Sequence, residues 1–451
     1  MRWAILFCLF FTGLRLEGDD SVNQTSLMVL DPGHFHAALV MKEMYPWLSP
    51  RISVYAPLGA DVLDYLNRVT LFNTRKDNPT SWQVELHTGP DFLERMLAEH
   101  PGNVVILAGR NRPKIERIRA SVEAGLNVLA DKPWIITSAD LPTLERILNE
   151  AEARHLVAYD IMTERYEITS ILQRELVNDE DVFGRLVEGT DAETAISAKS
   201  VHHLMKTVAG TPLRRPAWFF DIGETGEGLA DVGTHVVDLV QWTAFAGQKL
   251  DWQTDIRILS GKRWPTVMSK ADFQNVTGEP DFPAYLSAHL RGGSLEYYCN
   301  NSVHYTVKGA HVKLDIRWNW EAPAGAGDSY EAAFRGTRAR IELRQGQEQK
   351  YVPELYVAPV SGSVQAEVAA ALKRKIAALQ SRYPGLDMEG SAATAHIVIP
   401  EKYRVGHEAH FAQVTNQFFE YLKASDKTPA WEKSNMLVKY YVSTKGVEAA
   451  R

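Results

Sequence analysis

The stretch that most plainly carries chemistry is residues 226–238, GEGLADVGTHVVD. Asp231 and His235 stand four residues apart at the start of an apolar helical run, so both side chains share one helix face. A carboxylate beside an imidazole fixes its tautomer and raises its basicity, which is what a general base needs. Helix caps and surface pairs have the same spacing, so the pair alone leaves a structural role open.

A second reactive side chain is Lys132, in the segment Asp131-Lys132-Pro133. The segment follows an apolar run, LNVLAD, that we expect to be the fifth strand of a parallel sheet. A lysine at the carboxyl end of such a strand points into the ligand crevice, where its ammonium can hold a substrate oxygen. Pro133 restricts the lysine backbone and makes a cis peptide bond possible.

The first expected turn, DPGHFHAAL (31–39), stands where a dinucleotide-binding fold has its phosphate loop. Of the pattern G-x-G-x-x-G it keeps the middle glycine, Gly33, with Asp31 and His36 in the outer places. We predict that Gly33, His34, Phe35 and His36 contact a cofactor; a plain strand-to-helix turn is the alternative.

The end of the second expected strand also departs from the common pattern. It reads Tyr55-Ala56-Pro57, where an acid for the ribose hydroxyls is usual. Asp61 or Asp64 can take that role, or both can be solvated helix residues.

The elements expected around these residues alternate between strand and helix up to residue 160. Short apolar runs alternating with helices of about ten residues predict a parallel sheet covered on both faces. We therefore expect a Rossmann-type doubly wound α/β domain. Its strands are expected at 27–31, 51–57, 82–87, 103–109, 126–131 and 156–160, and its helices at 34–44, 59–69, 91–99, 114–124 and 141–154.

After residue 160 the pattern changes to one dominated by strands. Alternating faces predict one broad, mostly antiparallel sheet in a C-terminal α/β domain. The expected strands are 195–204, 255–261, 284–293, 294–301, 311–321, 339–346 and 350–359. The expected helices are 163–176, one from near Asp231, 367–380, 410–424 and 434–450.

Composition narrows the function. The 451 residues are 45% hydrophobic and 23% charged, as in an ordinary globular protein, and the net charge of −7 argues against nucleic acid as a partner. Residues 1–18 place Arg2 before about a dozen apolar residues, which is typical of a signal peptide; an uncleaved anchor or a mispredicted start codon is the alternative. We expect an exported protein, periplasmic or extracellular, with no membrane span after cleavage, and a cytoplasmic one if the signal does not work.

Together these segments resemble the Gfo/Idh/MocA oxidoreductases, which include glucose–fructose oxidoreductase and inositol 2-dehydrogenase. The likeness covers residues 27 to about 440 and rests on Lys132-Pro133, Asp231-x-x-x-His235 and the segments AGRN (108–111), ERYEI (164–168) and FGR (183–185). GHFHAA, DIMTER (160–165), SVHH (200–203) and RPAWFFD (215–221) look like a bacterial group of secreted oxidoreductases with its own C-terminal domain.

The resemblance implies a nucleotide-binding domain at 27–160 and a substrate and oligomerisation domain at 161–451. It also implies NAD or NADP and a sugar or glycoside substrate oxidised or reduced at a carbinol carbon. Because an exported enzyme meets no free cofactor pool, we expect the cofactor to be tightly bound. The reduced glycine motif and the missing second-strand acid leave the choice of cofactor open. Assembly into a homo-oligomer is expected by analogy.

The resemblance also assigns roles to residues. Lys132, Asp231 and His235 would be catalytic, with His235 oriented by Asp231 and Lys132 stabilising the alkoxide. Asn111 and Lys132 join the cofactor-binding set, and Arg165, His202, His203 and Trp218 are expected to bind substrate. For the aromatic loop that contains Trp218, core or dimer packing is the alternative. No pair of histidines has a spacing typical of a metal site, so we expect no metal.

Two other functions remain open. One is a redox-assisted glycoside hydrolase, in which transient oxidation permits elimination of the aglycone. The other is a non-catalytic carbohydrate-binding relative that has lost its cofactor, which the weak glycine loop favours and the catalytic residues oppose.

Overall fold

Six parallel strands form the sheet of the N-terminal half in the computed structural model, which describes residues 25–208, 211–212 and 214–451. The expected signal peptide lies outside these residues. The strands lie in the order β3-β2-β1-β4-β5-β6, which confirms the doubly wound fold. They are β1 (Thr25–Leu30), β2 (Leu48–Ala56), β3 (Gln83–Thr88), β4 (Val104–Leu107), β5 (Asn127–Ala130) and β6 (Ala158–Asp160).

Helices cover this sheet where the sequence predicts them, with one difference. They are α2 (Ala60–Thr74), α3 (Phe92–Glu99), α4 (Lys114–Glu123), α5 (Leu141–Ala153) and the short α1 (His36–Leu39). The prediction of a helix over 34–44 is therefore wrong except for the single turn of α1. The chain re-enters the sheet at Leu48, and Pro46 disfavours helical backbone at Tyr45 and cannot itself donate a helical hydrogen bond.

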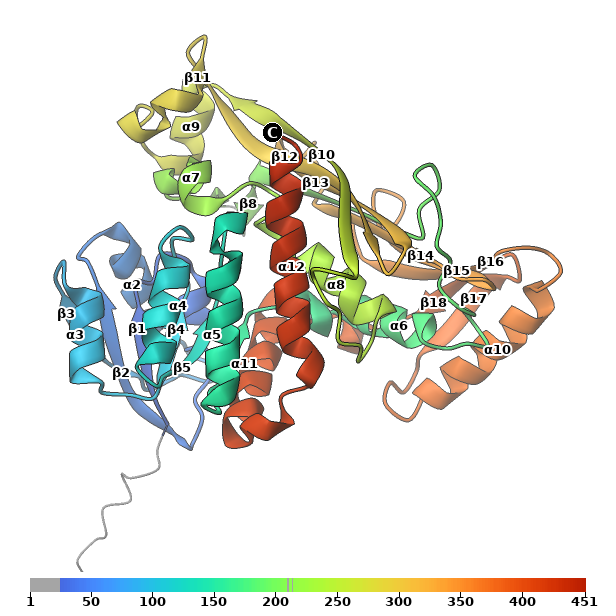
Figure 1. Ribbon diagram of the computed structural model, residues 1–451, viewed down its shortest axis with the longest axis horizontal. Helices are drawn as coiled ribbons and strands as arrows, with labels where there is room; N and C mark the ends of the chain where they lie inside the picture. The colour runs from blue at the N-terminus through green and yellow to red at the C-terminus, as the bar shows by residue number, and fades with distance from the viewer. Residues whose placement is uncertain (1–24, 209–210, 213) are drawn as a thin grey trace, which may run out of the picture.

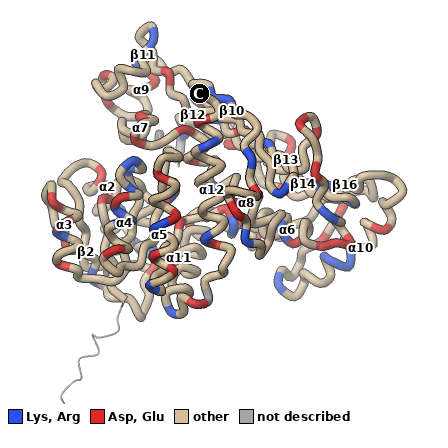
Figure 2. Tube along the Cα trace, viewed as in Figure 1, with Lys and Arg blue, Asp and Glu red and all other residues tan. Residues whose placement is uncertain are grey.

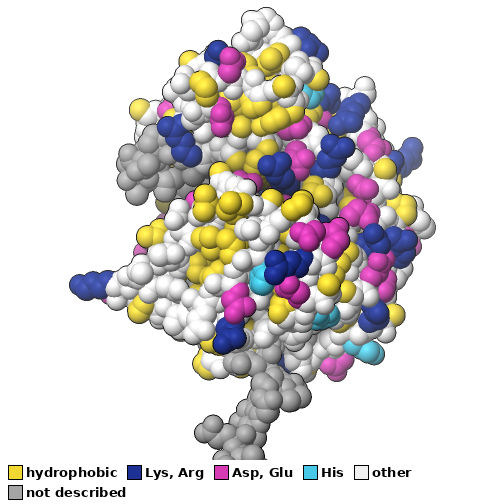
Figure 3. Space-filling model, turned by 90° about the vertical axis from the view of Figure 1, so that its left-hand side faces the viewer, with side chains coloured by type: hydrophobic (Ala, Val, Ile, Leu, Met, Phe, Trp, Pro, Cys, Tyr) yellow, Lys and Arg dark blue, Asp and Glu magenta, His cyan; other side chains and the backbone are white. Residues whose placement is uncertain are grey.

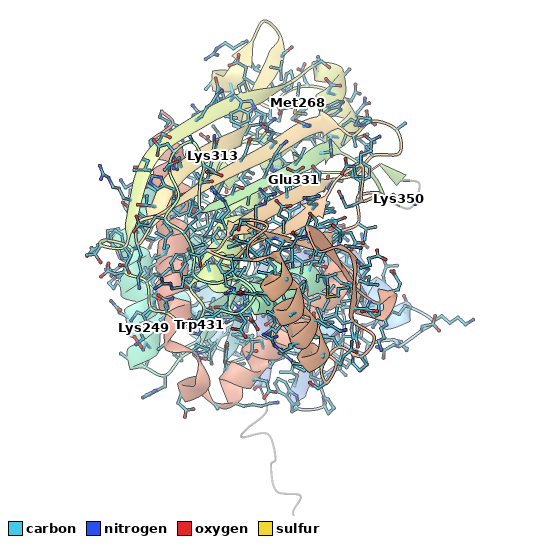
Figure 4. The ribbon with its side chains drawn as sticks, turned by 90° about the vertical axis from the view of Figure 1, so that its right-hand side faces the viewer. Lys249, Met268, Lys313, Glu331, Lys350 and Trp431 are labelled. Carbon is cyan, nitrogen blue, oxygen red and sulfur yellow. The ribbon has the colours of Figure 1, made fainter. Side chains whose placement is uncertain are left out.

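The second half builds a ten-stranded sheet in the order β10-β12-β13-β7-β14-β15-β16-β18-β17, with β11 beside β12. Its pairs are antiparallel except β7 with β13, which confirms a mostly antiparallel sheet. The strands lie side by side in Figure 4, where Met268, Lys313 and Glu331 mark β10, β13 and β14. They are β7 (Ile196–Met205), β10 (Ile256–Met268), β11 (Leu290–Arg291), β12 (Ser294–Val307), β13 (Ala310–Glu321), β14 (Ser329–Arg335), β15 (Ala339–Gln345), β16 (Glu354–Pro359), β17 (Asp387–Ser391) and β18 (Thr394–Val398).

Two expected elements take another form. The strand expected over 284–293 is a 3₁₀ turn, Ala284–His289, followed by the two residues of β11. Its Leu286 is fully buried in the same apolar cluster as Phe273 of α9 (Lys270–Thr277), which favours a tight turn over an extended segment. The helix expected over 163–176 is split at Glu167, whose carboxylate accepts hydrogen bonds from the N–H groups that begin α6 (Ile168–Val177).

Three helices join the halves. Helix α8 (Val232–Ala244) packs against α12 (Ala430–Glu448), which also contacts α5 and β10 and runs through the middle of Figure 1. Helix α11 (His407–Lys423) buries Phe411, Val414 and Phe418 in the apolar core that contains β1 and β2. The nucleotide-type half is therefore completed by a helix from the C-terminal part of the chain.

The surface carries both signs of charge. Figure 2 shows basic and acidic residues interspersed along the trace, and on the face in Figure 3 charged and hydrophobic side chains are mixed. Within the part of the chain that the structure describes, no helix is both long and apolar enough to cross a bilayer.

Candidate active site

A cavity of about 620 Å³ lies between the two halves, at the carboxyl ends of the parallel strands. Residues that follow β1, β4, β5 and β6 form one side, and residues of α8, β7 and the large sheet form the other. This is where a doubly wound sheet binds its ligands. Of the predicted site residues, those that line the cavity are His34, Phe35, His36, Asn111, Lys132, His202, Trp218, Asp231 and His235.

Lys132 and Asp231 form an ion pair inside this cavity. Lys132 follows β5, and its peptide bond to Pro133 is cis; Asp231 is the residue before α8. Burial disfavours the charged form of both groups, but the attraction between the two charges outweighs this effect. The pKa of Lys132 is therefore raised and the pKa of Asp231 is lowered. The lysine therefore stays protonated and can donate a hydrogen bond to a ligand oxygen.

His235 lines the cavity one helical turn after Asp231, yet the two side chains do not pair. The expectation that Asp231 orients the imidazole is wrong for this structure, because Lys132 takes the carboxylate. The Nδ1 atom of His235 is buried without a hydrogen-bond partner. Burial and the nearby Lys132 ammonium lower the pKa of His235 well below its usual value, so the ring is neutral at neutral pH.

Arg165 does not line the cavity. Its guanidinium is buried and binds both carboxylate oxygens of Asp238, at 2.6 and 2.7 Å, and Glu432 at 2.7 Å. Lys439 belongs to the same network, because its ammonium lies 3.4 Å from Asp238 and 2.5 Å from Asp160. The expected substrate-binding role of Arg165 is therefore replaced by a structural one, joining α8 and α12.

Gly33 also lies outside the cavity lining, because Trp218 covers it. A Cβ atom on Gly33 would lie 3.3 Å from the Trp218 ring and 3.4 Å from the Asp61 carboxylate. The indole N–H of Trp218 donates to Asp61 at 3.2 Å, and Arg110 stacks on the indole. Trp218, expected to bind substrate, thus contacts the loop expected to bind cofactor.

The loop around Gly33 fits a dinucleotide only in part. The backbone N–H groups of Gly33 and His34 both donate to the Ala108 carbonyl at 2.9 Å, whereas a phosphate loop keeps such groups for its ligand. Asp31 has a φ of 46° at the place of the first glycine. A diphosphate over Gly33 would require Trp218 to move.

Asn111 lines the cavity with both ends of its amide already bonded. Its Nδ2 donates to the Thr225 carbonyl at 2.8 Å, and its Oδ1 accepts from Lys114 at 2.7 Å. The predicted cofactor contact would therefore have to use its remaining hydrogen-bonding capacity.

The fold adds a group that sequence spacing did not reveal. His34 Nδ1 lies 2.8 Å and His36 Nδ1 3.1 Å from Oδ2 of Asp131, which is 97 residues away from His34 in the sequence. Burial, the largest effect, lowers the pKa of His36 to about 3. The signal available in the sequence is the His-x-His pattern in the turn after β1. In the structure this turn faces Asp131, the residue before Lys132.

Polar and aromatic residues surround the opposite end of the cavity. His202 lies 3.1 Å from Asp328, which also pairs with Lys206, and its ring lies near Trp318. His203 does not line the cavity; it is buried and bonded to Asp328 at 3.0 Å. Asp328, Arg215 and Trp318 line this end and were not predicted as site residues. Arg215 begins the segment RPAWFFD, from which only Trp218 was chosen, and nothing in the local sequence marks Asp328 or Trp318.

Comparison with known proteins places this geometry in a family. A family profile described as "Putative oxidoreductase C terminal domain" matches residues 172–451. The crystal structure of a putative oxidoreductase from Parabacteroides merdae is 45% identical, with a TM-score of 0.93, over 95% of this chain and 98% of that one. None of the curated proteins compared matches the chain.

More distant structures share the fold. A putative oxidoreductase from Thermotoga maritima is 13% identical, with a TM-score of 0.59, over 94% of this chain and 97% of that one. KijD10, a 3-ketoreductase from Actinomadura kijaniata in complex with NADP and TDP-benzene, is 13% identical, with a TM-score of 0.54, over 92% and 95%. The chain belongs to the Gfo/Idh/MocA-type oxidoreductases, in the group with this C-terminal domain.

Proposed function

We propose that the protein is an NAD(P)-dependent oxidoreductase that transfers a hydride between nicotinamide and a sugar or glycoside carbon bearing a hydroxyl or keto group. The observation that carries the proposal is the Lys132–Asp231 pair beside the neutral His235, in one cavity at the carboxyl ends of a doubly wound sheet. A bound nicotinamide would supply hydride acceptance or donation.

The chain's own residues account for the proton chemistry. The Lys132 ammonium, held charged by Asp231, would donate to the substrate oxygen and stabilise negative charge as it develops. His235, with a neutral ring, would take the hydroxyl proton during oxidation and return it during reduction. His34, Phe35, His36 and Asn111 would border the cofactor.

A sugar substrate suits the far end of the cavity. Phe219, Tyr297 and Trp318 present aromatic surface, and His202, Lys206 and Asp328 present polar groups. Aromatic faces pack on the apolar face of a pyranose, and the polar groups suit its hydroxyls. The 3-ketoreductase with the same fold agrees with this class of reaction.

Trp218 over Gly33 favours one alternative, a carbohydrate-binding relative without cofactor. The test is to purify the protein without added nucleotide, denature it, and identify any released NAD(H) or NADP(H) by absorbance and mass. We expect released nucleotide, or binding of added nucleotide. Absence of both would overturn the enzyme proposal.

Substrate tests then separate the two enzyme functions. Incubating the nucleotide-bound protein with aryl glycosides should produce a keto-glycoside, detected by mass. Release of the free aglycone would instead identify the redox-assisted hydrolase.

The proposal includes export and self-association. Residues 1–18 have the composition of a signal peptide, and an exported enzyme meets no free cofactor pool, so tight binding would be needed. The large sheet offers a broad face to a second copy. Fractionation of the native host and light scattering of the purified protein test these two points.

A further inference from the structure

We propose that His34, His36 and Asp131 form a binding site for a divalent first-row transition-metal ion. One ligand atom from each residue lies within 4.8 Å of the other two. The two contacts to Asp131 Oδ2, 2.8 and 3.1 Å, are close to the separation of about 3.3 Å between neighbouring ligands of a tetrahedral ion with bonds of 2.0–2.1 Å. A small outward movement of the two rings would therefore admit an ion.

Two polar atoms of this cluster lack any hydrogen-bond partner. They are Nδ1 of His36 and Oδ1 of Asp131, on side chains that are 7% and 4% exposed. The 3.1 Å approach of His36 to Asp131 is not aligned as a hydrogen bond. Buried polar atoms normally have partners because leaving them without one is costly. A bound cation would give Nδ1 of His36 a partner, and it would also satisfy Oδ1 of Asp131 when the carboxylate binds through both of its oxygens.

The surrounding structure holds Asp131 and His36 in place. The Asp131 N–H donates to the Leu107 carbonyl at 2.7 Å, and its carbonyl accepts from the buried Lys114 at 2.9 Å. The His36 ring packs against the rings of His407 and Phe411, with centroid distances of 5.2 and 5.1 Å. Ligands on such supported positions need little ordering when an ion binds.

The donor set indicates the kind of ion and its open side. Two imidazoles and one carboxylate suit zinc, iron, cobalt or manganese, and three protein ligands leave positions for an outside ligand. All three residues line the cavity beside Lys132, so the open positions would take an oxygen atom from the ligand in the cavity. Metal binding requires no nucleotide, so a failure of this proposal is distinguishable from a failure of the proposed function.

A second cluster provides a matched control. Asp191, His304 and His311 also bring three ligand atoms together, but Asp191 is 81% exposed and the two histidines bond each other at 3.0 Å. This cluster lies outside the cavity lining and leaves no buried donor or acceptor without a partner among its three residues.

The experiment uses the full-length protein, stripped with a chelator and dialysed against Zn(II) or Co(II). Metal content is measured by elemental analysis, and Co(II) coordination by visible absorption. We expect one ion per chain in the wild type and in a His304→Ala/His311→Ala variant, and at least tenfold weaker binding in His34→Gln, His36→Ala and Asp131→Asn. Zinc should raise the melting temperature of the wild type and leave that of Asp131→Asn unchanged.

Folding of each variant is checked by circular dichroism, and the partly exposed His34 provides the variant least prone to misfold. The proposal would be overturned if the wild type bound no ion, if His34→Gln bound as tightly as the wild type, or if binding was lost in the His304→Ala/His311→Ala variant.

Discussion

The Lys132 ammonium and the Asp231 carboxylate meet across the cavity from positions 99 residues apart in the sequence. One belongs to the nucleotide-type sheet and the other begins the helix that packs under the large sheet. The pair therefore joins the halves at the point where the reaction is proposed to occur, and it keeps the lysine charged.

Replacing Lys132 with Met should abolish the donor while keeping much of the side-chain length. We expect kcat to fall by about 10²–10³-fold, as when one donor to a developing oxyanion is removed. Lys375→Met is the control, because Lys375 forms a partly buried ion pair with Glu175 outside the cavity. A Lys132→Met enzyme with more than a tenth of wild-type kcat would contradict the assigned role.

His235→Ala should abolish turnover and leave nucleotide binding intact, because the imidazole is proposed to move a proton. Turnover and nucleotide content are measured on the same preparation. His410→Ala is a matched control: this histidine is also buried, burial lowers its pKa to about 4, and it lies outside the cavity lining. An active His235→Ala enzyme would remove His235 from the base role.

Trp218→Ala should uncover Gly33. We expect the Kd for NAD or NADP to fall several-fold, because a diphosphate would no longer have to displace the indole from Asp61. Titration calorimetry measures the change, and Trp264→Ala on β10 is the control for loss of a tryptophan. Unchanged or weaker nucleotide binding would show that Trp218 does not obstruct this loop.

Arg165→Met should damage stability and spare substrate binding. It leaves Asp238 and Glu432 buried with one fewer cation, a change that costs about 3–5 kcal/mol in comparable buried pairs. Urea unfolding measures the loss, and Arg174→Met, which removes a stack on Trp242, is the control. A raised KM without loss of stability would return Arg165 to the substrate site.

Glu164→Gln should change how stability depends on pH. Burial, and then the neighbouring Glu167, raise the pKa of Glu164 to about 7 from an ordinary value of 4.5. The folded protein then holds this proton more tightly than the unfolded chain, so the wild type loses stability as pH rises from about 4.5 to 7. The glutamine variant lacks this loss.

The advantage of Glu164→Gln over the wild type should therefore grow from pH 4 to pH 8, as measured by urea unfolding at each pH. A constant difference across this range would show that Glu164 titrates normally.

The sheet of the first half was predictable because its information is local. Each strand is a short apolar run and each helix has its own pattern, and their alternation predicts a parallel, doubly wound sheet, which has the order β3-β2-β1-β4-β5-β6. The turn at Ala284–His289 was not predictable, because the burial of Leu286 depends on partners from α9. Strand β14 was missed because its only signal, SYEAAFR, is short and weakly apolar.

The sequence predicted single residues of the site, but it did not predict which side chains from distant parts of the chain pair with one another. Lys132 and His235 were placed in the cavity because each follows or opens a recognisable element. Asp231 could pair with His235, four residues away, or with Lys132, 99 residues away, and tertiary packing selects Lys132. The approach of Asp131 to His34 and His36 crosses the intervening β4 in the same way.

Helix α11 has a consequence for synthesis on the ribosome. It buries Phe411, Val414 and Phe418 on one face of the first sheet. Helices α1 and α2 cover part of that face early, but a nascent chain that has made β6 must wait for residues 161–423 before α11 covers the rest, which takes tens of seconds at about 5–20 residues per second. During this interval the part of the sheet that α11 will cover is open to chaperones or to other nascent chains.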